Sequence, residues 1–565
     1  MRRFGTDILF SASDLTTFIA CRHAATLHRM VFEGLIDRPE RDDEMLELRR
    51  RLGDEHEKRY LAELRDRGLD VLEVPDTLAL DERIALTTEA MRAGTAGVIF
   101  QAALRDGSWA GFADFLLRVD APAGAGGHAY EIVDTKLSTK VKPSHAIQLA
   151  LYAMMVTAMH GTVPPALRVR LGPSRDAGRT PPEVSIGPAQ AMGSTRVAMR
   201  SFEAFFAAFA PGSAPATSPE PCAHCKSCDF QSRCTAEWEA AGHLSVVANI
   251  RAAQVEKLRA HGIDSIGALA AHAGPVPGVK PAILERLREQ ARLQVATREQ
   301  PPGLPPAHDV LPVVPGKGFL RLPAPAEGDV FFDMEGYPQH PEGGLEYLFG
   351  AWVAGEGGGF RTFWAHDRAG EKLALEGFLD WLDRHLDAHP GAHVYHYHHY
   401  ETSALRRLAS HHATREATLD ALMRREVFVD LFGVVREQLR IGEPAYSLKN
   451  VEKLYRARRD GHVANAGDSI VAYARWCATG EAAILGSIEA YNRDDCVSTQ
   501  ELRDWLVARR PDDLPWFAPG APSGAGADAQ GTGSELVQGC GKKKRSGSVS
   551  RGQPGVGICP DRRSI

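Results

Sequence analysis

Apolar residues recur every four positions between residues 48 and 64, which predicts a helix whose inner stripe includes His56. Three apolar runs follow between residues 98 and 137, separated by turn-forming segments. Runs of this length with such boundaries predict an antiparallel meander of strands. A helix over residues 144–159 is expected to follow the meander.

The second half of the chain also changes from strand patterns to helical patterns. The strand candidates are residues 330–335, 346–354, 360–365 and 393–397. The pattern predicts an α/β chain with five segments. They are a first α/β domain (1–240), a small helix-hairpin-helix-like connector (241–305), a proline-rich linker (306–327), a second α/β domain (328–510) and a disordered tail (511–565).

Composition excludes several classes of protein. The 565 residues are 44% hydrophobic and 24% charged, as in an ordinary folded chain, and the longest apolar run is too short for a bilayer span. We therefore expect no membrane partner, and a cytoplasmic location because no apolar segment follows the first basic residues. The net charge of -6 argues against coating nucleic acid through bulk charge but allows a local basic groove.

Acids interrupt two of the apolar runs in the first domain. Asp114 lies in one run, and Asp134 and Lys136 lie two residues apart in the next, so both of the latter project from one face of a strand. A carboxylate pair can hold a metal that activates water, and a lysine can stabilise the negative charge that develops on a phosphate. The alternative is a surface salt bridge on an edge strand.

A second set of acids opens the other α/β domain. Asp333 and Glu335 are two apart in a buried-strand sequence, and Tyr491 and Asp495 share one stripe of a late helix. Neighbouring acids repel each other, and divalent cations would relieve that repulsion. The pattern therefore predicts a second metal centre.

Four cysteines fall within thirteen residues, which indicates a metal site. Cys222, Cys225, Cys228 and Cys234 could form a self-contained structural zinc site. Cys21, two hundred residues earlier, could instead supply a fourth thiolate to the last three. Both arrangements are compatible with the spacing alone.

The first domain resembles the RecB-type branch of the PD-(D/E)xK nucleases, which includes CRISPR-associated exonucleases with an iron-sulfur cluster. The resemblance implies a restriction-endonuclease-like fold in which His56, Asp114 and Asp134 bind Mg²⁺ or Mn²⁺ and Lys136 assists the water. It also implies that Gln148 and Tyr152 line the nucleic-acid side. The cluster would be a 4Fe-4S group on the cysteines, namely Cys21, Cys225, Cys228 and Cys234.

The second domain resembles the DEDD exonucleases of the ribonuclease H-like fold, tyrosine subtype. The resemblance assigns Asp333, Glu335, Glu401 and Asp495 to two metals, with Tyr491 orienting the water. Relatives usually have aspartate where this chain has Glu401, so the longer side chain changes the metal spacing at this position.

The chain to about residue 510 resembles RecB-like nucleases that join these two domains. This implies a metal-dependent nuclease that acts on DNA, single-stranded or at ends, in repair, recombination or nucleic-acid processing, with RNA as an alternative substrate and exonucleolytic action. Relatives often continue into a helicase, and no phosphate-binding loop occurs here, so a helicase would be a separate partner. The alternative function is a nucleic-acid-binding scaffold in which one or both centres are degenerate.

Overall fold

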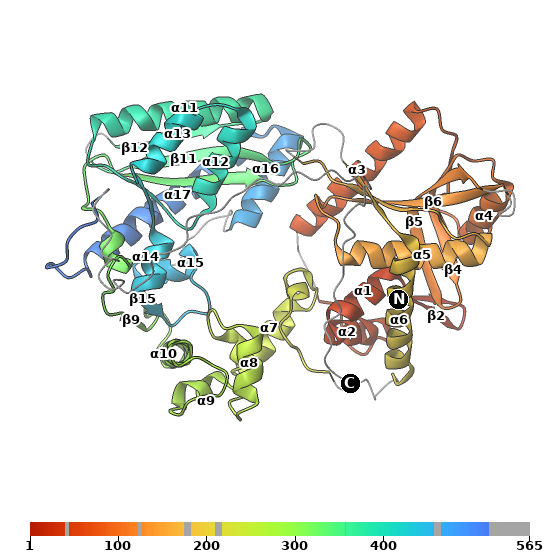
Figure 1. Cartoon of the computed structure of the whole chain (residues 1–565), viewed down its shortest axis with the longest axis horizontal. Helices are drawn as coiled ribbons and strands as arrows, with labels where there is room; N and C mark the ends of the chain where they lie inside the picture. Colours follow the sequence, from red (N-terminus) through yellow and green to blue (C-terminus); the bar gives the residue numbers. More distant parts are fainter. Residues whose placement is uncertain are drawn as a thin grey trace, which may run out of the picture. The chain divides into compact units, whose positions relative to one another are not determined.

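The computed structural model describes residues 1–518, except for residues 40–43, 122–126, 175–181, 210–216, 356–357 and 457–464. Most of the expected tail, residues 519–565, lies outside the described residues. The described chain is a mixed α/β structure (Figure 1). No helix in these described ranges is both long and apolar enough to cross a membrane.

A six-stranded sheet organises the first domain, in the order β3-β4-β5-β6-β7-β8. The predicted meander is confirmed, because β4, β5 and β6 are antiparallel neighbours. The strands are β3 (Val71–Glu73), β4 (Val98–Asp106), β5 (Trp109–Asp120), β6 (His128–Lys136), β7 (Leu167–Leu171) and β8 (Glu183–Ile186), and a separate hairpin joins β1 (Arg2–Phe4) to β2 (Asp7–Leu9). Strands β6 and β7 are parallel, so the sheet is mixed.

Helices cover this sheet. The long helix α5 packs against it, with α1 and α6 in contact with α5 (Figure 1). The helices are α1 (Ala12–Ala20), α2 (Arg22–Phe32), α3 (Glu44–Asp66), α4 (Leu80–Ala93), α5 (Pro143–His160) and α6 (Pro188–Ala207). The predicted stripe of α3 is buried, His56 included.

One strand of the sheet departs from regular geometry beside Asp114. Pairing between β4 and β5 passes from Phe100↔Phe115 to Ala102↔Ala113, which leaves Gln101 and Asp114 unpaired with the register unchanged. Gln101 has a φ of 55°, which is rare for a residue with a long side chain. Its side chain donates a hydrogen bond to Glu57 on α3.

Helices connect the two α/β domains, and those from η4 onward share an apolar cluster of their own. They are η3 (Ala223–Ser227), α7 (Gln231–Ala240), η4 (Leu244–Val246), α8 (Ala252–Arg259), α9 (Ile266–Ala271) and α10 (Pro281–Glu299). The proline-rich stretch over residues 306–327 packs against the second domain. Its strand β9 (His308–Val310) pairs with β15 (Leu439–Ile441), and Phe319 in η5 (Gly318–Arg321) is fully buried, because apolar residues between the prolines reach the second core.

The second domain is built on a five-stranded sheet in the order β12-β11-β10-β13-β14. The strands are β10 (Val330–Tyr337), β11 (Leu345–Val353), β12 (Gly359–Trp364), β13 (Val394–His396) and β14 (Phe428–Asp430). The helices are α11 (Arg368–Ala388), α12 (Tyr400–His412), α13 (Glu416–Arg424), α14 (Leu431–Gln438), α15 (Leu448–Val451), η6 (Glu452–Leu454), α16 (Ala466–Thr479) and α17 (Ala482–Val507). All four predicted strands are present.

Strand β10 separates two cores because its side chains alternate between the faces of the sheet. Val330, Phe332 and Met334 join the core beneath α11 and α12. Phe331 joins the core on the other face, which includes residues of α17. The alternation therefore puts Asp333 and Glu335 on the α17 side.

Candidate active sites

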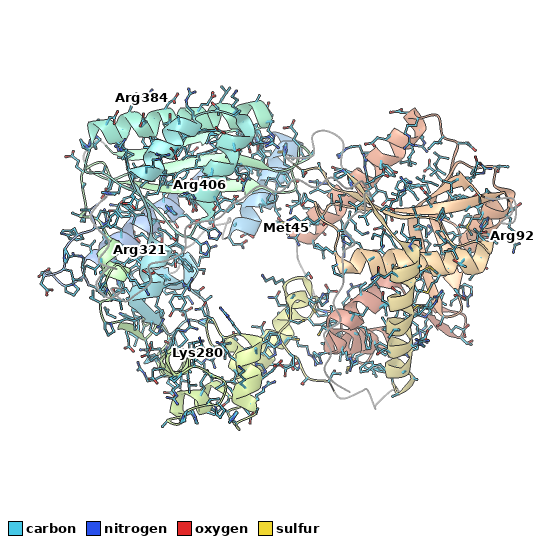
Figure 2. The ribbon with its side chains drawn as sticks, in the orientation of Figure 1. Met45, Arg92, Lys280, Arg321, Arg384 and Arg406 are labelled. Carbon is cyan, nitrogen blue, oxygen red and sulfur yellow. The ribbon has the colours of Figure 1, made fainter. Side chains whose placement is uncertain are left out.

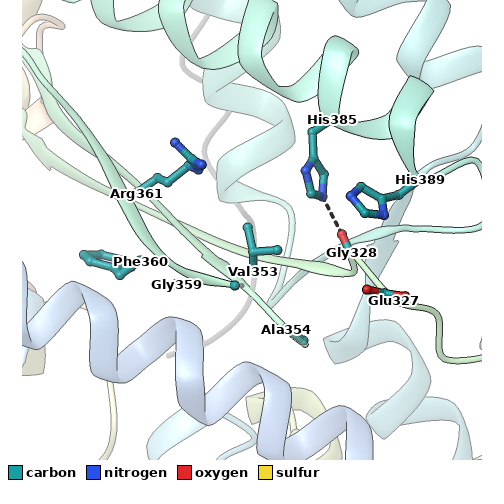
Figure 3. Close-up of a pocket in the computed structure, with 10 residues that line it drawn as sticks. Glu327, Gly328, Val353, Ala354, Gly359, Phe360, Arg361, His385 and His389 are labelled. Carbon is teal, nitrogen blue, oxygen red and sulfur yellow. Dashed lines mark hydrogen bonds between the residues drawn. The ribbon is translucent and has the colours of Figure 1, made fainter. Parts of the chain in front are cut away.

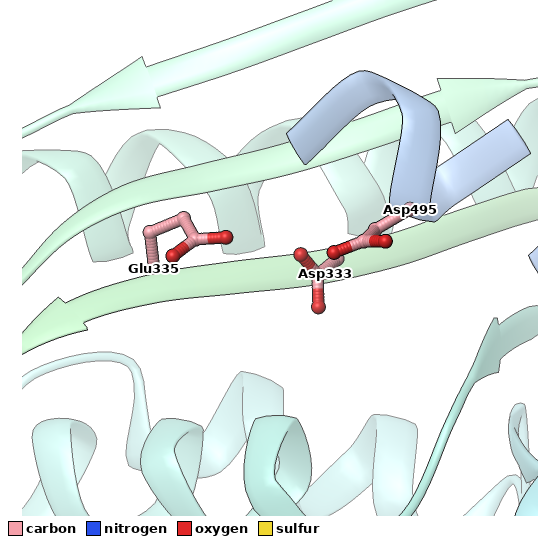
Figure 4. Close-up of side chains that lie close together, drawn as sticks. All are labelled: Asp333, Glu335 and Asp495. Atoms are coloured by element: carbon pink, nitrogen blue, oxygen red, sulfur yellow. The ribbon is translucent and has the colours of Figure 1, made fainter. Parts of the chain in front are cut away.

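Three carboxylates meet in the second domain. Asp333 and Glu335 project from β10 and Asp495 from α17, and one oxygen of each lies within 4.8 Å of the others. Figure 4 shows Asp333 facing Asp495, with Glu335 farther along the same strand. Among the described residues, no other three acids, histidines or cysteines meet this closeness. Oxygen donors at this separation suit Mg²⁺ or Mn²⁺.

The electrostatics of this trio favour a cation. Burial, and then the charges of Asp495 and Glu335, raise the pKa of Asp333 well above its ordinary value. Burial, and then Asp495, raise the pKa of Glu335 to about 8, although hydrogen bonds from Ser469 and Asn492 act in the opposite direction. A divalent cation would stabilise the charged forms of these acids.

Glu401 and Tyr491 lie next to the trio. Glu401 is buried in the first turn of α12, and its charge contributes to the raised pKa of Asp333. Its Oε2 is 3.5 Å from Nδ1 of His396. Burial, and then the charge of Asp495, raise the pKa of Tyr491, which also shares a hydrogen bond with Asp495. The structure thus brings Glu401 close to the trio but not into it.

Asn492 is a residue of this site that the sequence pattern did not reveal. Its Nδ2 donates a 2.7 Å hydrogen bond to Oδ2 of Asp333. Gly350 lies directly opposite Asp333 on β11, and a Cβ there would collide with the Asn492 amide. A glycine inside a strand indicates close approach by another group, so Gly350 is the one sequence feature that could have predicted a neighbour beside Asp333.

A cavity of about 340 Å³ lies beside this centre. His396, which contacts Glu401, lines it together with Arg321 and Arg406, both labelled in Figure 2. Arg321 pairs with Glu437 at 3.3 Å. Arg406 instead donates to the sulfur of Met423, and no described carboxylate lies within ion-pair distance of it. Arg406 therefore brings a positive charge to this cavity without a carboxylate partner among the described residues.

Figure 3 shows another cavity, of about 460 Å³, at the beginning of β10. Its walls include Arg361, His385 and His389, and Nε2 of His385 donates a 2.7 Å hydrogen bond to the carbonyl oxygen of Gly328. None of the residues that line it is one of the candidate acids. This cavity is not part of the metal centre.

The first domain also brings its acids to one place. Oδ2 of Asp114 accepts hydrogen bonds from the backbone N–H and the hydroxyl of Thr135, at 2.8 and 3.0 Å. Asp134, the preceding residue on β6, is fully buried and pairs with Lys136 at 2.5 Å. Burial, and then Asp114, raise the pKa of Asp134 to about 7. Burial alone would lower the pKa of Lys136, but Asp134 and Asp114 outweigh it and raise that pKa.

Glu57, rather than His56, approaches these acids. His56 is buried, as expected, but its Nε2 lies 3.4 Å from the carbonyl oxygen of Arg170. Burial, and then the charge of Asp114, raise the pKa of Glu57 to about 7. The two residues are neighbours on α3 and project about 100° apart, so only one can face the site. Glu57 is thus a further candidate ligand beside Asp114, and the assignment of His56 as a metal ligand stays a prediction.

Gln148 and Tyr152 form a hydrogen-bonded pair behind Asp134. Nε2 of Gln148 donates to Oδ1 of Asp134 at 3.0 Å and contacts the Tyr152 hydroxyl at 3.2 Å. Tyr152 is 6% exposed, and a Cβ on Gly111 would collide with its ring. In this arrangement the pair orients Asp134, and the place of Gln148 and Tyr152 on the nucleic-acid side stays a prediction.

The cysteines gather around the start of α2. Cys21 ends α1 and begins α2, and it packs in one small cluster with Cys228 and Cys234. Burial, and then the charges of Cys228, Glu237, Cys21 and Cys225, raise the pKa of Cys234 to about 11. The remote cysteine and the local group therefore share one neighbourhood, as expected. No three of the described cysteine sulfurs lie within 4.8 Å of one another.

These features define a chain with two acid centres on two nuclease-type folds. Residues 10–235 match the family model of the PD-(D/E)XK nuclease superfamily, and residues 330–507 match that of the RNase_H superfamily. A search of curated proteins and one of solved structures gave no significant match. The chain thus joins a PD-(D/E)XK nuclease superfamily domain to an RNase H superfamily domain, which makes it a nuclease of the phosphodiester-hydrolysing kind with a nucleic-acid substrate.

Proposed function

We propose that this protein is a RecB-like, divalent-metal-dependent exonuclease that degrades DNA from single strands or ends through two hydrolytic centres. The observation that carries the proposal is the meeting of Asp333, Glu335 and Asp495 within 4.8 Å. Bound Mg²⁺ or Mn²⁺ would polarise the phosphate and lower the pKa of the attacking water. DNA repair, recombination or nucleic-acid processing in the cytoplasm is the proposed setting, with any helicase supplied separately.

In the second domain, Asp333, Glu335 and Asp495 would hold the metals, and Glu401 would complete the set from α12. Asn492 would keep the Asp333 carboxylate in place through its 2.7 Å hydrogen bond. Tyr491, with its phenol proton retained because its pKa is raised, would orient the nucleophilic water. Arg406 would contact a backbone phosphate of the strand.

In the first domain, Asp114, Asp134 and Glu57 would hold a metal, and Lys136 would stabilise the charge on the phosphate. Gln148 would fix the orientation of Asp134 through its 3.0 Å hydrogen bond. The raised pKa of Lys136 keeps this side chain charged at neutral pH, as electrostatic stabilisation requires.

The cysteine cluster would hold a structural 4Fe-4S group on Cys21, Cys225, Cys228 and Cys234. Four thiolates on one tetrahedral zinc ion stand about 3.8 Å apart when each metal–sulfur bond is about 2.3 Å. Because no three of the described cysteine sulfurs lie within 4.8 Å of one another, they are farther apart than the four thiolates of a zinc site. Each thiolate of a four-iron cluster binds a different iron, which suits wider spacing. Structural zinc remains the alternative and predicts a colourless protein.

The test uses anaerobically purified protein and end-labelled single- and double-stranded DNA and RNA, with Mg²⁺, Mn²⁺ or EDTA. The proposal expects stepwise loss of nucleotides from DNA ends with either metal and none in EDTA. Binding that persists in EDTA, with no cleavage under any metal, would favour the scaffold with degenerate centres. Internal cuts in a circular single strand would refute the exonucleolytic assignment.

A further inference from the structure

Helix η3 brings Cys222 next to Cys225, one of the cysteines assigned to the cluster. A 3₁₀-helix has three residues per turn, so side chains three positions apart eclipse one another. Cys222 caps the N-terminus of η3, Cys225 lies within it and Cys228 caps its C-terminus. The sulfur contact between Cys222 and Cys225 places these two thiols on the same side of η3.

Cys222 is in direct contact with its neighbours. Its sulfur lies 3.8 Å from the sulfur of Cys225, and its backbone N–H donates to that sulfur at 3.3 Å. The charge of Cys222 also contributes to the raised pKa of Cys21, after burial. Cys222 therefore lies in the same neighbourhood as two of the assigned thiols.

The 3.8 Å separation has a chemical meaning. It equals the spacing of about 3.8 Å between two thiolates on one metal ion with bonds of about 2.3 Å. Cys222 and Cys225 can therefore reach the same metal position. In a four-iron cluster each thiolate ligand binds a different iron. Cys222 and Cys225 therefore offer two thiols for one iron of the cluster.

We infer that Cys222 is a reserve ligand that binds the iron at the corner of the cluster assigned to Cys225 when the Cys225 thiolate is lost. The inference rests on the proposed cluster and concerns only the ligand set. Cys234 provides the contrast, because it lies in α7 and not on η3 beside Cys222. Loss of Cys225 should be tolerated and loss of Cys234 should not.

The experiment measures iron and acid-labile sulfide per chain, together with visible absorption, in full-length protein purified anaerobically. The variants are Cys225→Ser, Cys234→Ser, Cys222→Ser and the double variant Cys222→Ser/Cys225→Ser. Cys225→Ala is added because a serine oxygen can itself bind iron. Cys477→Ser, at an exposed cysteine of α16, is the matched control.

We expect the wild type, Cys222→Ser and Cys477→Ser to hold equal iron, and both single Cys225 variants to keep at least half of it. Cys234→Ser and the double variant should lose most of it. Circular dichroism identifies any variant that fails to fold. Reconstitution of folded apo-protein with Fe²⁺ and sulfide then measures iron uptake, which should rank the variants in the same order. Equal losses in the Cys225 and Cys234 variants, or loss in Cys222→Ser alone, would overturn the inference. A wild type without iron would overturn the proposed cluster as well.

Discussion

The two acid centres balance their charge in different ways. In the first domain, the Lys136 ammonium lies 2.5 Å from the buried carboxylate of Asp134, so a side chain of the protein supplies the positive charge. In the second domain, Asp333 accepts a hydrogen bond from the neutral amide of Asn492. Its neighbours Asp495 and Glu335 are both acids that raise its pKa. The second centre would therefore rely more on a bound cation to balance the charge of its acids.

Removal of one acid from each centre gives the largest expected effect. Asp134→Asn and Asp333→Asn should each reduce cleavage at their own centre. Loss of a residue that only hydrogen-bonds to a metal ligand typically costs roughly 10–100-fold, and loss of a ligand itself should cost more. The double variant should be inactive. Rates on end-labelled single-stranded DNA with Mn²⁺ measure both effects.

Asp494→Asn is the control for this pair of variants. Asp494 is next to Asp495 on α17 but pairs with Arg456 at 3.1 Å. It should keep the wild-type rate. A double variant as active as wild type would exclude both centres as the source of cleavage.

Glu57 and His56 provide a matched pair within the first centre. Glu57→Gln should weaken Mn²⁺ binding and cleavage at this centre by about 10–100-fold, because a carboxylate beside Asp114 is replaced by a neutral amide. His56→Gln should change metal binding little. Mn²⁺ titration in an Asp333→Asn background isolates the first centre, and the opposite ranking would assign the metal to His56 rather than to Glu57.

Arg406 tests whether the cavity beside Glu401 belongs to the substrate path of the second centre. Arg406→Ala should weaken binding of single-stranded DNA uniformly across sequences and reduce the salt dependence by about one unit of slope. Arg384→Ala, on α11, should have no such effect (Figure 2). Binding in EDTA over a range of salt concentrations measures the slope, and identical slopes for the two variants would remove Arg406 from the path.

The smallest effect concerns the stability of the metal-free protein. The unfolded chain releases the proton of Glu335 near the ordinary pKa of 4.5, whereas the folded chain keeps it up to about 8. The folded state then binds more protons, so the free energy of unfolding should decrease as pH rises from 4.5 to 8.

Glu335→Gln isolates this contribution, because glutamine does not titrate. In EDTA its melting temperature should fall less than that of the wild type over the same pH range, with about 2–4 °C for each kcal/mol of difference. Parallel melting curves would show that burial of Glu335 carries no such cost.

The sequence predicted most of what depends on local periodicity. The two-residue repeat of strands placed Asp333 with Glu335 on one face of β10, and the helical repeat placed Tyr491 with Asp495 on α17. The same logic correctly buried His56. It did not identify Glu57, because burial on a helix stripe does not reveal which neighbouring residue faces a particular carboxylate.

Contacts between distant segments could not be predicted in this way. The proline content of residues 306–327 excluded a long helix but did not show that Phe319 fills the second core. Likewise, Asn492 acquires its role from Gly350, which is 142 positions away in the chain and becomes its neighbour only when β11 and α17 pack together. Such roles belong to tertiary packing.

Helix α17 supplies Tyr491, Asn492 and Asp495 together, and this has a consequence for synthesis on the ribosome. The last strand of the sheet, β14, ends at Asp430, whereas α17 begins at Ala482. A growing chain can therefore complete the sheet, with Asp333 and Glu335 in place, before their partners have been translated. The second centre would remain incomplete until this final helix emerges and docks.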